Sequence, residues 1–249
     1  MKALSLVILL TGVPLFLGFS QLPCQWAPGM YWEWSTAIPQ SPSWGGTTSV
    51  YVLKAEMWGD YETDLLAWIS PFKGGKLVKL GVVVRQPCSS MRGFGFWYSD
   101  IYRWVFYPPG STIELHWRAE GSGESAIQVE LSEERVAVEV PAGVFPECVK
   151  LTRYSHVANE FGTMEGEETI WFDEFLGWPV KAEYVVYYKD RVYTGQTELL
   201  SYGKLTVEEA VSQVLAALEE MEVLNESLAQ EAQHIRDQLE SLGLFSEGQ

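Results

Sequence analysis

Residues 180–199 read V-K-A-E-Y-V-V-Y-Y-K-D-R-V-Y-T-G-Q-T-E-L, and they contain two runs rich in β-branched and aromatic residues. These residue types suit the pleated, half-buried surface of a β-sheet. The polar pair Lys189 and Asp190 separates the runs at 180–188 and 192–199, as turn residues do between two strands. The stretch therefore predicts two successive β-strands.

The same pattern continues towards the N-terminus. Further strand-like segments cover residues 50–55, 77–84, 94–107, 113–118, 135–140, 149–157 and 169–172. Turn residues such as Gly74 and Gly75 separate these segments, and no helical pattern intervenes. Many short strands joined by turns indicate an antiparallel sheet, a sandwich or an open barrel. We therefore predict a mainly β fold, with an antiparallel domain at 47–203 that follows an irregular Pro-, Gly- and Trp-rich leader at 21–46.

The pattern changes at Leu205, where helical spacing begins. Thr206 and Glu209 have the spacing of a capping box, and Gly243 is a typical helix stop. Between these positions apolar residues recur in 4-3 steps. We predict one long amphipathic helix of coiled-coil type over 205–243, followed by a tail at 244–249.

The heptad register places one polar residue, Asn225, at a core position, where a buried Asn fixes the register of a coiled coil. The predicted oligomerisation seam consists of Val211, Leu218, Asn225, Leu228, Ile235 and Leu239. We therefore expect a homo-oligomer through this helix, or docking of the helix on an envelope protein. The alternative is a helix that folds back over an apolar face of its own β domain.

Residues 1–20 predict a signal peptide. The run at 3–19 is almost unbroken in its apolar character, and Gly18 and Ser20 suit cleavage after Ser20. We therefore expect an exported protein that is periplasmic, on the cell surface or extracellular. An uncleaved membrane anchor and lipidation of Cys24 are the alternatives.

Three cysteines are present: Cys24, Cys88 and Cys148. An oxidising compartment favours pairing, and the odd number leaves one cysteine over. We predict a Cys88–Cys148 disulfide, because both residues lie in the β region while Cys24 lies in the leader. No two cysteines have the short spacing of metal ligands, so no metal site is predicted.

Aromatic residues are unusually abundant, with 11 Trp, 12 Tyr and 11 Phe. Their density at 94–107 exceeds what the core of one strand pair needs. An aromatic-lined concavity for an apolar ligand or lipid is therefore a candidate site, formed by Phe94, Phe96, Trp97, Tyr102, Trp104, Phe106, Trp171 and Phe172. The net charge of −16 and the absence of any basic run exclude nucleic acid as a partner.

One element suggests a family. Residues 138–151 read V-E-V-P-A-G-V-F-P-E-C-V-K-L, and 171–181 read W-F-D-E-F-L-G-W-P-V-K. This pair resembles a group of bacterial exported proteins of unknown function with a V-P-A-G-x-F…C-x-K element and a following W-F…G-x-V-K strand. The resemblance implies a curved antiparallel sheet, often a half-barrel, in the cell envelope. It covers a small part of the chain, and the family has no agreed activity.

The residues of this element also have a structural explanation. Pro141 fixes φ and ends a strand, and Gly143 permits a tight turn. Phe145 would then anchor the turn in the core. The element therefore predicts a hairpin corner, with Pro141, Gly143 and Phe145 as its turn residues.

No catalytic constellation is apparent in the sequence. There is no G-x-S-x-G or H-E-x-x-H motif, and the three histidines have no local partners. No catalytic residue and no cofactor are therefore predicted. The sequence favours a non-enzymatic envelope protein that acts as an interaction or assembly module, and the alternative is a carrier of an apolar ligand or lipid.

Overall fold

The structure is a computed structural model that describes residues 26–42, 45–58, 61–84, 93–98, 101–106, 112–118, 124–159, 162–173, 176 and 178–245. The predicted signal peptide, Cys24 and Cys88 lie outside these residues. Strands and helices follow in the order β1 (Met30–Ala37), β2 (Gly46–Trp58), β3 (Tyr61–Phe72), β4 (Gly75–Val84), β5 (Gly93–Tyr98), β6 (Ile101–Phe106), β7 (Thr112–Arg118), β8 (Glu124–Val140), β9 (Gly143–Asn159), β10 (Gly162–Asp173), β11 (Trp178–Tyr188), β12 (Arg191–Lys204), α2 (Val207–Glu222) and α3 (Glu226–Ser241).

The described residues confirm a mainly β fold. The main sheet has the strand order β4-β3-β2-β1-β12-β11-β10-β9-β8-β7, and β5 pairs with β6 separately. The pairs from β2 to β4 and from β7 to β12 are antiparallel between neighbours. Short turns and period-2 burial along these strands produce this arrangement, as the sequence predicted.

The chain forms two compact units. One contains Thr36–Pro42 and Pro87–Leu199, and the other contains Cys24–Ser35, Ser43–Gln86 and Leu200–Gln249. The predicted β region at 47–203 is therefore divided between the units, and the second unit also includes both helices.

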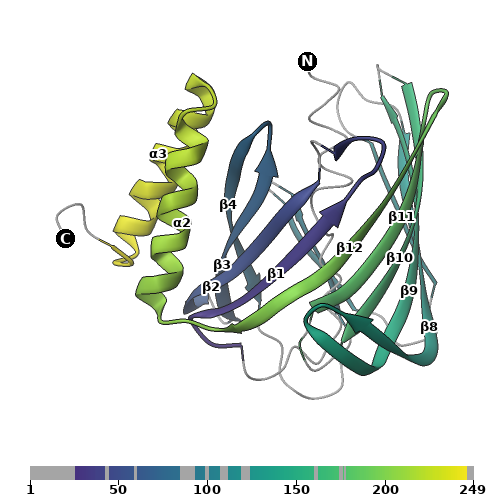
Figure 1. The fold of residues 1–249 in the computed structure, drawn as a ribbon, viewed down its shortest axis with the longest axis horizontal. Helices are drawn as coiled ribbons and strands as arrows, with labels where there is room; N and C mark the ends of the chain where they lie inside the picture. Colours follow the sequence, from purple (N-terminus) through teal and green to yellow (C-terminus); the bar gives the residue numbers. More distant parts are fainter. Residues whose placement is uncertain are drawn as a thin grey trace. The chain divides into compact units, whose positions relative to one another are not determined.

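In the second unit, α2 and α3 run side by side along β2–β4 (Figure 1). The buried side chains that join helices and strands are Tyr51, Leu53, Leu65, Ala67, Ile69, Val78, Ala210, Val211, Val214, Ala217, Leu218, Met221, Ala232, Ile235 and Leu239. The Val78 N–H donates to the Met221 sulfur at 3.4 Å, which ties α2 to β4. Burial of this apolar stripe is the main stabilising contribution to a helix pair of this length.

The prediction of one uninterrupted helix at 205–243 is wrong. The capping box of α2 is present: the Glu209 N–H donates to Thr206 Oγ1 at 3.1 Å, and the Thr206 N–H donates to Glu209 Oε2 at 2.8 Å. The chain then leaves the helix, and Asn225 is extended with φ −172°. Its Oδ1 accepts the Leu228 N–H at 3.1 Å, so Asn225 is the N-cap of α3. Asn is strongly favoured at an N-cap because its side chain replaces a missing backbone acceptor.

Most residues of the predicted oligomerisation seam pack against strands of the same chain. Val211, Leu218, Ile235 and Leu239 are buried against β2–β4, and Leu228 packs at the margin of the same cluster. Asn225 is exposed and does not occupy a core. The fold-back alternative therefore describes the observed packing. An oligomer built on this seam would have to open the second unit.

In the first unit, the β8–β9 connection is a hairpin corner. Pro141 and Ala142 form the turn, and Val140 pairs with Gly143, whose φ of +133° favours glycine. Phe145 is buried beneath the turn. The Ala142 N–H donates to the Leu199 carbonyl at 3.1 Å, which fastens the corner to β12.

Cys148 lies beneath this corner as a free thiol. Its predicted partner Cys88 lies outside the described residues, so the Cys88–Cys148 disulfide stays a prediction. The Cys148 side chain is fully buried, and its S–H donates to the Phe145 carbonyl at 3.8 Å. Burial raises the pKa of the Cys148 thiol to about 12.

Candidate functional site

Strands β9–β12 form the part of the first unit where polar and aromatic side chains gather. Burial alternates strictly along β11: Ala182, Tyr184 and Val186 are buried, whereas Glu183 and Tyr187 are exposed. Successive side chains of a strand point to opposite faces of the sheet. This region therefore has a buried face and an exposed face, and each has its own chemistry.

A row of polar residues crosses the buried face. Arg153 on β9 pairs in register with Glu168 on β10, which pairs with Tyr184 on β11, which pairs with Gly195 on β12. The Arg153 guanidinium forms an ion pair with the Glu168 carboxylate. Only 4% of the Arg153 side chain and 15% of the Glu168 side chain are exposed. Burial raises the pKa of Glu168, and the positive charge of Arg153 opposes that shift.

The glycine at the end of this row makes room for the tyrosine. A Cβ atom on Gly195 would overlap the Tyr184 ring and hydroxyl, so the ring lies across the bare backbone of β12. Tyr184 is 7% exposed, and its hydroxyl has no hydrogen-bond partner among the described residues. Burial, followed by the negative charge of Glu168, raises the pKa of Tyr184 well above its usual value. Tyr184 is therefore a neutral hydrogen-bond donor at ordinary pH.

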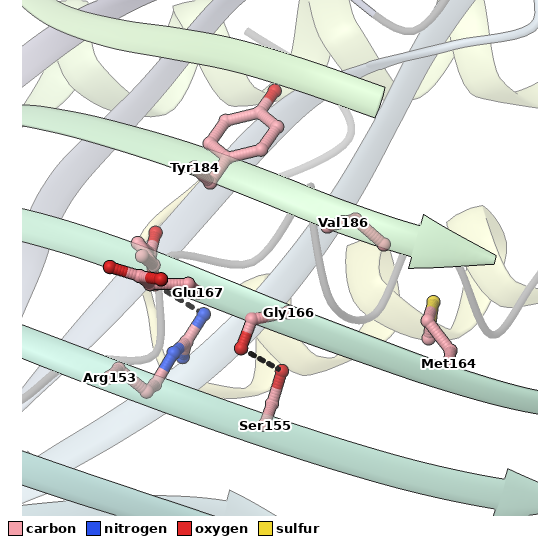
Figure 2. Close-up of a pocket in the computed structure, with 8 residues that line it drawn as sticks. Arg153, Ser155, Met164, Gly166, Glu167, Tyr184 and Val186 are labelled. Carbon is pink, nitrogen blue, oxygen red and sulfur yellow. Dashed lines mark hydrogen bonds and ion pairs between the residues drawn. The ribbon is translucent and has the colours of Figure 1, made fainter. Parts of the chain in front are cut away.

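A small cavity of about 20 Å³ lies beside this row (Figure 2). Its polar lining includes Arg153 and Tyr184, and its apolar lining includes Met164 and Val186. The Ser155 hydroxyl, also in the lining, donates to the Gly166 carbonyl at 3.5 Å. Arg153 Nη1 is buried and lacks a hydrogen-bond partner among the described residues, like the Tyr184 hydroxyl. Glu168 Oε2 is also buried without a hydrogen-bond partner among these residues, and the Tyr184 hydroxyl points away from Arg153 (Figure 2). Buried polar atoms are normally paired, so these unpaired atoms along the row mark a candidate site.

The exposed face carries aromatic and acidic side chains. We define the tyrosine face as Tyr154, Glu165, Glu167, Tyr187 and Val192. Tyr154, Tyr187 and Val192 are 39%, 51% and 49% exposed. Tyr154 pairs in register with Glu167, and Tyr187 pairs with both Glu165 and Val192.

The electrostatics of this face are negative. The pKa of Tyr154 is raised first by its own desolvation and then by the negative charges of Glu130 and Glu167. His156 Nδ1 lies 3.5 Å from Glu165 Oε1 and offsets one carboxylate when the imidazole is protonated. The face therefore offers exposed aromatic area beside carboxylates.

The structure describes only two side chains of the predicted aromatic ligand site, Trp171 and Phe172, so the site as a whole stays a prediction. Phe94, Phe96 and Trp97 lie on β5, and Tyr102, Trp104 and Phe106 lie on β6, whose side chains are outside the described part of the structure. Phe172 is 1% exposed on the buried face of β10. Trp171 lies on the opposite face, with Lys181 Nζ 5.3 Å from its ring centroid. Trp171 and Phe172 therefore cannot line one concavity, because adjacent residues of a strand face opposite sides.

Sequence reasoning missed the buried polar row. Side chains alternate between the two faces along β10, and Met164, Ile170 and Phe172 point to the buried face. Glu168 is an even number of residues from each of them, so its side chain points to the same face. A charged residue at an inward position of a strand was the available signal. Among the described residues, no group of three or more His, Cys, Asp or Glu side chains could hold a metal ion. None of the described helices combines the length and the apolar character needed to cross a membrane.

Comparisons with known proteins are sparse. No family model matches the chain. No curated protein matches it either. One similar solved structure is a Bacteroides fragilis protein inferred to be exported, with a YmcC-like fold; it is 15% identical with a TM-score of 0.47, over 72% of this chain and 97% of that one. Another is an inferred lipoprotein from Parabacteroides distasonis, 12% identical with a TM-score of 0.46, over 71% of this chain and 96% of that one.

Proposed function

We propose that this chain is an exported, non-enzymatic interaction protein whose tyrosine face docks a partner protein with a basic surface. The observation that carries the proposal is the exposure of Tyr154, Tyr187 and Val192 together on one sheet face, beside carboxylates. Large apolar side chains that gather at the surface mark interaction sites more often than isolated ones do. The signal-peptide pattern at 1–20 supports the expectation of export.

The residue types of this face suit a protein partner. Tyrosine is enriched at interfaces, because its ring supplies apolar area and its hydroxyl stays hydrated or bonded at the rim. An antiparallel sheet presents such rings from a rigid backbone, which limits the entropy lost on binding. The tyrosine face therefore combines a rigid support with two aromatic side chains.

The charges of the tyrosine face indicate which charge the partner's surface should have. Glu165 and Glu167 lie among the aromatic residues, and the whole chain has a net charge of −16. Lys or Arg side chains could pair with these carboxylates and also lie over the tyrosine rings. A second copy of the chain would bring the same negative charge, which opposes close approach. Charge complementarity thus favours a basic partner over self-association through this face.

The buried polar row supports the non-enzymatic part of the proposal. A general acid or base is most effective when its pKa lies near the working pH. The pKa of Tyr184 is raised far from that range, and the Glu168 carboxylate is engaged by Arg153. These groups are better suited to holding a neighbour by hydrogen bonds than to transferring protons.

Site-specific photo-crosslinking tests the proposed interface. A photoreactive amino acid would replace Tyr187 in a host that exports the protein, and the control would carry it at Glu240, which is exposed on α3. We expect a defined adduct at position 187 whose mass identifies a protein with a basic surface. Glu167→Lys should weaken this adduct, whereas Glu240→Lys, with the same change in net charge, should not. Equal adducts at both positions, or none at position 187, would contradict the proposal.

A further inference from the structure

We propose that the protein partner of the tyrosine face also contacts a second row of side chains, Lys150, Trp171 and Lys181, and presents an acidic group to it. We call these three residues the tryptophan row. The inference rests on the proposed function and specifies the charge pattern of the partner, which is basic at one end of the contact and acidic at the other. The strand register, the area of the tyrosine face and the charges of the tryptophan row carry it.

The strand register places the tryptophan row on the same sheet face as the tyrosines. Lys150 on β9 pairs with Trp171 on β10, and Trp171 pairs with Lys181 on β11. Lys150 is an even number of residues from Tyr154, in a β9–β10 register that has no shift between them. Residues at even separations along a strand share a face, and six residues of β11 separate Lys181 from Tyr187. The tryptophan row therefore lies about 20 Å from Tyr187 along the strands.

The tyrosine face alone is too small for a specific protein contact. Its side chains occupy two adjacent rows on β9–β12, so its footprint is about 7 Å by 14 Å, or about 100 Å². A stable complex buries about 800 Å² on each partner, and even transient contacts exceed this footprint several-fold. Extending the contact along the strands to the tryptophan row lengthens it about threefold. Tryptophan is also the side chain most enriched among the residues that dominate binding energy.

The charges of the tryptophan row differ from those of the tyrosine face. Lys181 Nζ lies 5.3 Å from the Trp171 ring centroid and pairs with Glu183 Oε1 at 2.7 Å, so its charge is matched within the chain. Glu198 is in register with Lys181 on the next strand. Lys150, on the other side of Trp171, is joined by no ion pair to another described residue. Its unmatched positive charge beside a half-buried tryptophan suits a carboxylate of the partner.

Crosslinking at two positions tests whether one partner spans both rows. A photoreactive amino acid would replace Thr152, which lies on β9 between Tyr154 and Lys150, and Tyr187 in a separate variant, with Glu240 again as the control position. We expect adducts of the same mass at positions 152 and 187. An adduct at 187 without one at 152, or adducts of different mass, would overturn the inference and leave the proposed function standing. Absence of an adduct at 187 would overturn the proposed function and this inference with it.

Charge variants test the acidic group of the partner. Lys150→Glu should reduce the yield of the adduct at position 187 about fivefold, because an attractive pair becomes repulsive. Lys79→Glu, at an exposed position of β4, makes the same change in net charge and should leave the yield unchanged. Lys150→Arg should retain the adduct, and Lys150→Gln should lower its yield by less than the charge reversal. Equal yields in Lys150→Glu and Lys79→Glu, with unchanged melting temperatures by circular dichroism, would overturn the inference.

Discussion

Removing the Tyr184 hydroxyl should make the unliganded protein more stable. The side chain is 7% exposed, and the hydroxyl has no hydrogen-bond partner among the described residues. A buried hydroxyl without a partner costs about 1–3 kcal/mol relative to its hydrated state. We expect Tyr184→Phe to raise the free energy of unfolding by about 1 kcal/mol, the lower end of that range. For a chain of this length the melting temperature should rise by about 2–4 °C.

Urea denaturation followed by circular dichroism measures this change, with Tyr187→Phe as the exposed control. The control hydroxyl is in water in both states, so its free energy of unfolding should stay within about 0.5 kcal/mol of wild type. The comparison requires equal m-values, because only then does a shifted midpoint report stability. A loss of about 1 kcal/mol or more in Tyr184→Phe would show that the hydroxyl has a stabilising partner and would refute the reasoning.

The pH dependence gives an independent check of the same residue. Burial raises the pKa of Tyr184 above the usual value of 10.0, so the unfolded chain releases this proton first as the pH rises. The folded state then holds more protons than the unfolded state, and stability falls with increasing pH beyond about 10. The stability linked to the protonated Tyr184 hydroxyl is fully present below about pH 10 and is lost above it. Tyr184→Phe has no such hydroxyl, so its stability does not depend on this proton. The stability advantage of the variant should therefore grow at alkaline pH.

Three further changes probe other parts of the structure. Gly195→Ala places a methyl group against the Tyr184 ring and should lower the free energy of unfolding, measured in urea, by about 1–3 kcal/mol. The same substitution in a Tyr184→Ala background should lower it by less, because the ring that the methyl group would overlap is absent. Asn225→Leu removes the N-cap of α3 and should lower the free energy of unfolding by about 0.5–2 kcal/mol. Native mass spectrometry should give the same stoichiometry as wild type, and a changed stoichiometry would support the coiled-coil prediction instead. Cys148 should react with iodoacetamide at about pH 8 only when urea unfolds the chain, because burial raises the pKa of its thiol to about 12. Peptide mass mapping measures the reaction, and alkylation of Cys148 in native buffer would contradict the prediction.

The sequence predicted those elements whose stabilising interactions join residues close together in the chain. The capping box of Thr206 and Glu209 forms as the sequence indicates, because both hydrogen bonds depend on a spacing of three residues. The corner at Pro141 and Gly143 likewise depends on backbone preferences of the turn itself. The alternation along 180–188 appears directly as the burial pattern of β11.

The C-terminal region shows why a regular pattern can mislead. The 4-3 spacing of apolar residues continues across Asn225, because α2 and α3 each direct a stripe at the same core. A coiled coil and a helical hairpin on a sheet require nearly the same period. Asn225 suits both interpretations, since asparagine occurs at a core position of a coiled coil and also at an N-cap. Only the tertiary packing distinguishes them.

The candidate site could not be predicted from local signals, because it arises from register. Arg153, Glu168, Tyr184 and Gly195 come from four strands, and only the pairing of those strands aligns them in one row. Glycine at 195 has no local purpose in a strand, and its role becomes clear only when the Tyr184 ring lies across it. Strand pairing depends on contacts across the sheet, so the sequence of any one strand does not contain it.

The arrangement of the second unit sets an order in which the chain can fold. Strands β2–β4 end at Val84, but the helices that cover their apolar face begin at Val207. A growing or translocating chain therefore produces those strands long before it produces their cover. Until α3 is complete, the face around Leu53 and Leu65 is open to water and to other chains, which is the condition under which nascent proteins aggregate or need a holding chaperone. The second unit must fold late, after the last helix has emerged, while the strands of the first unit can already pair.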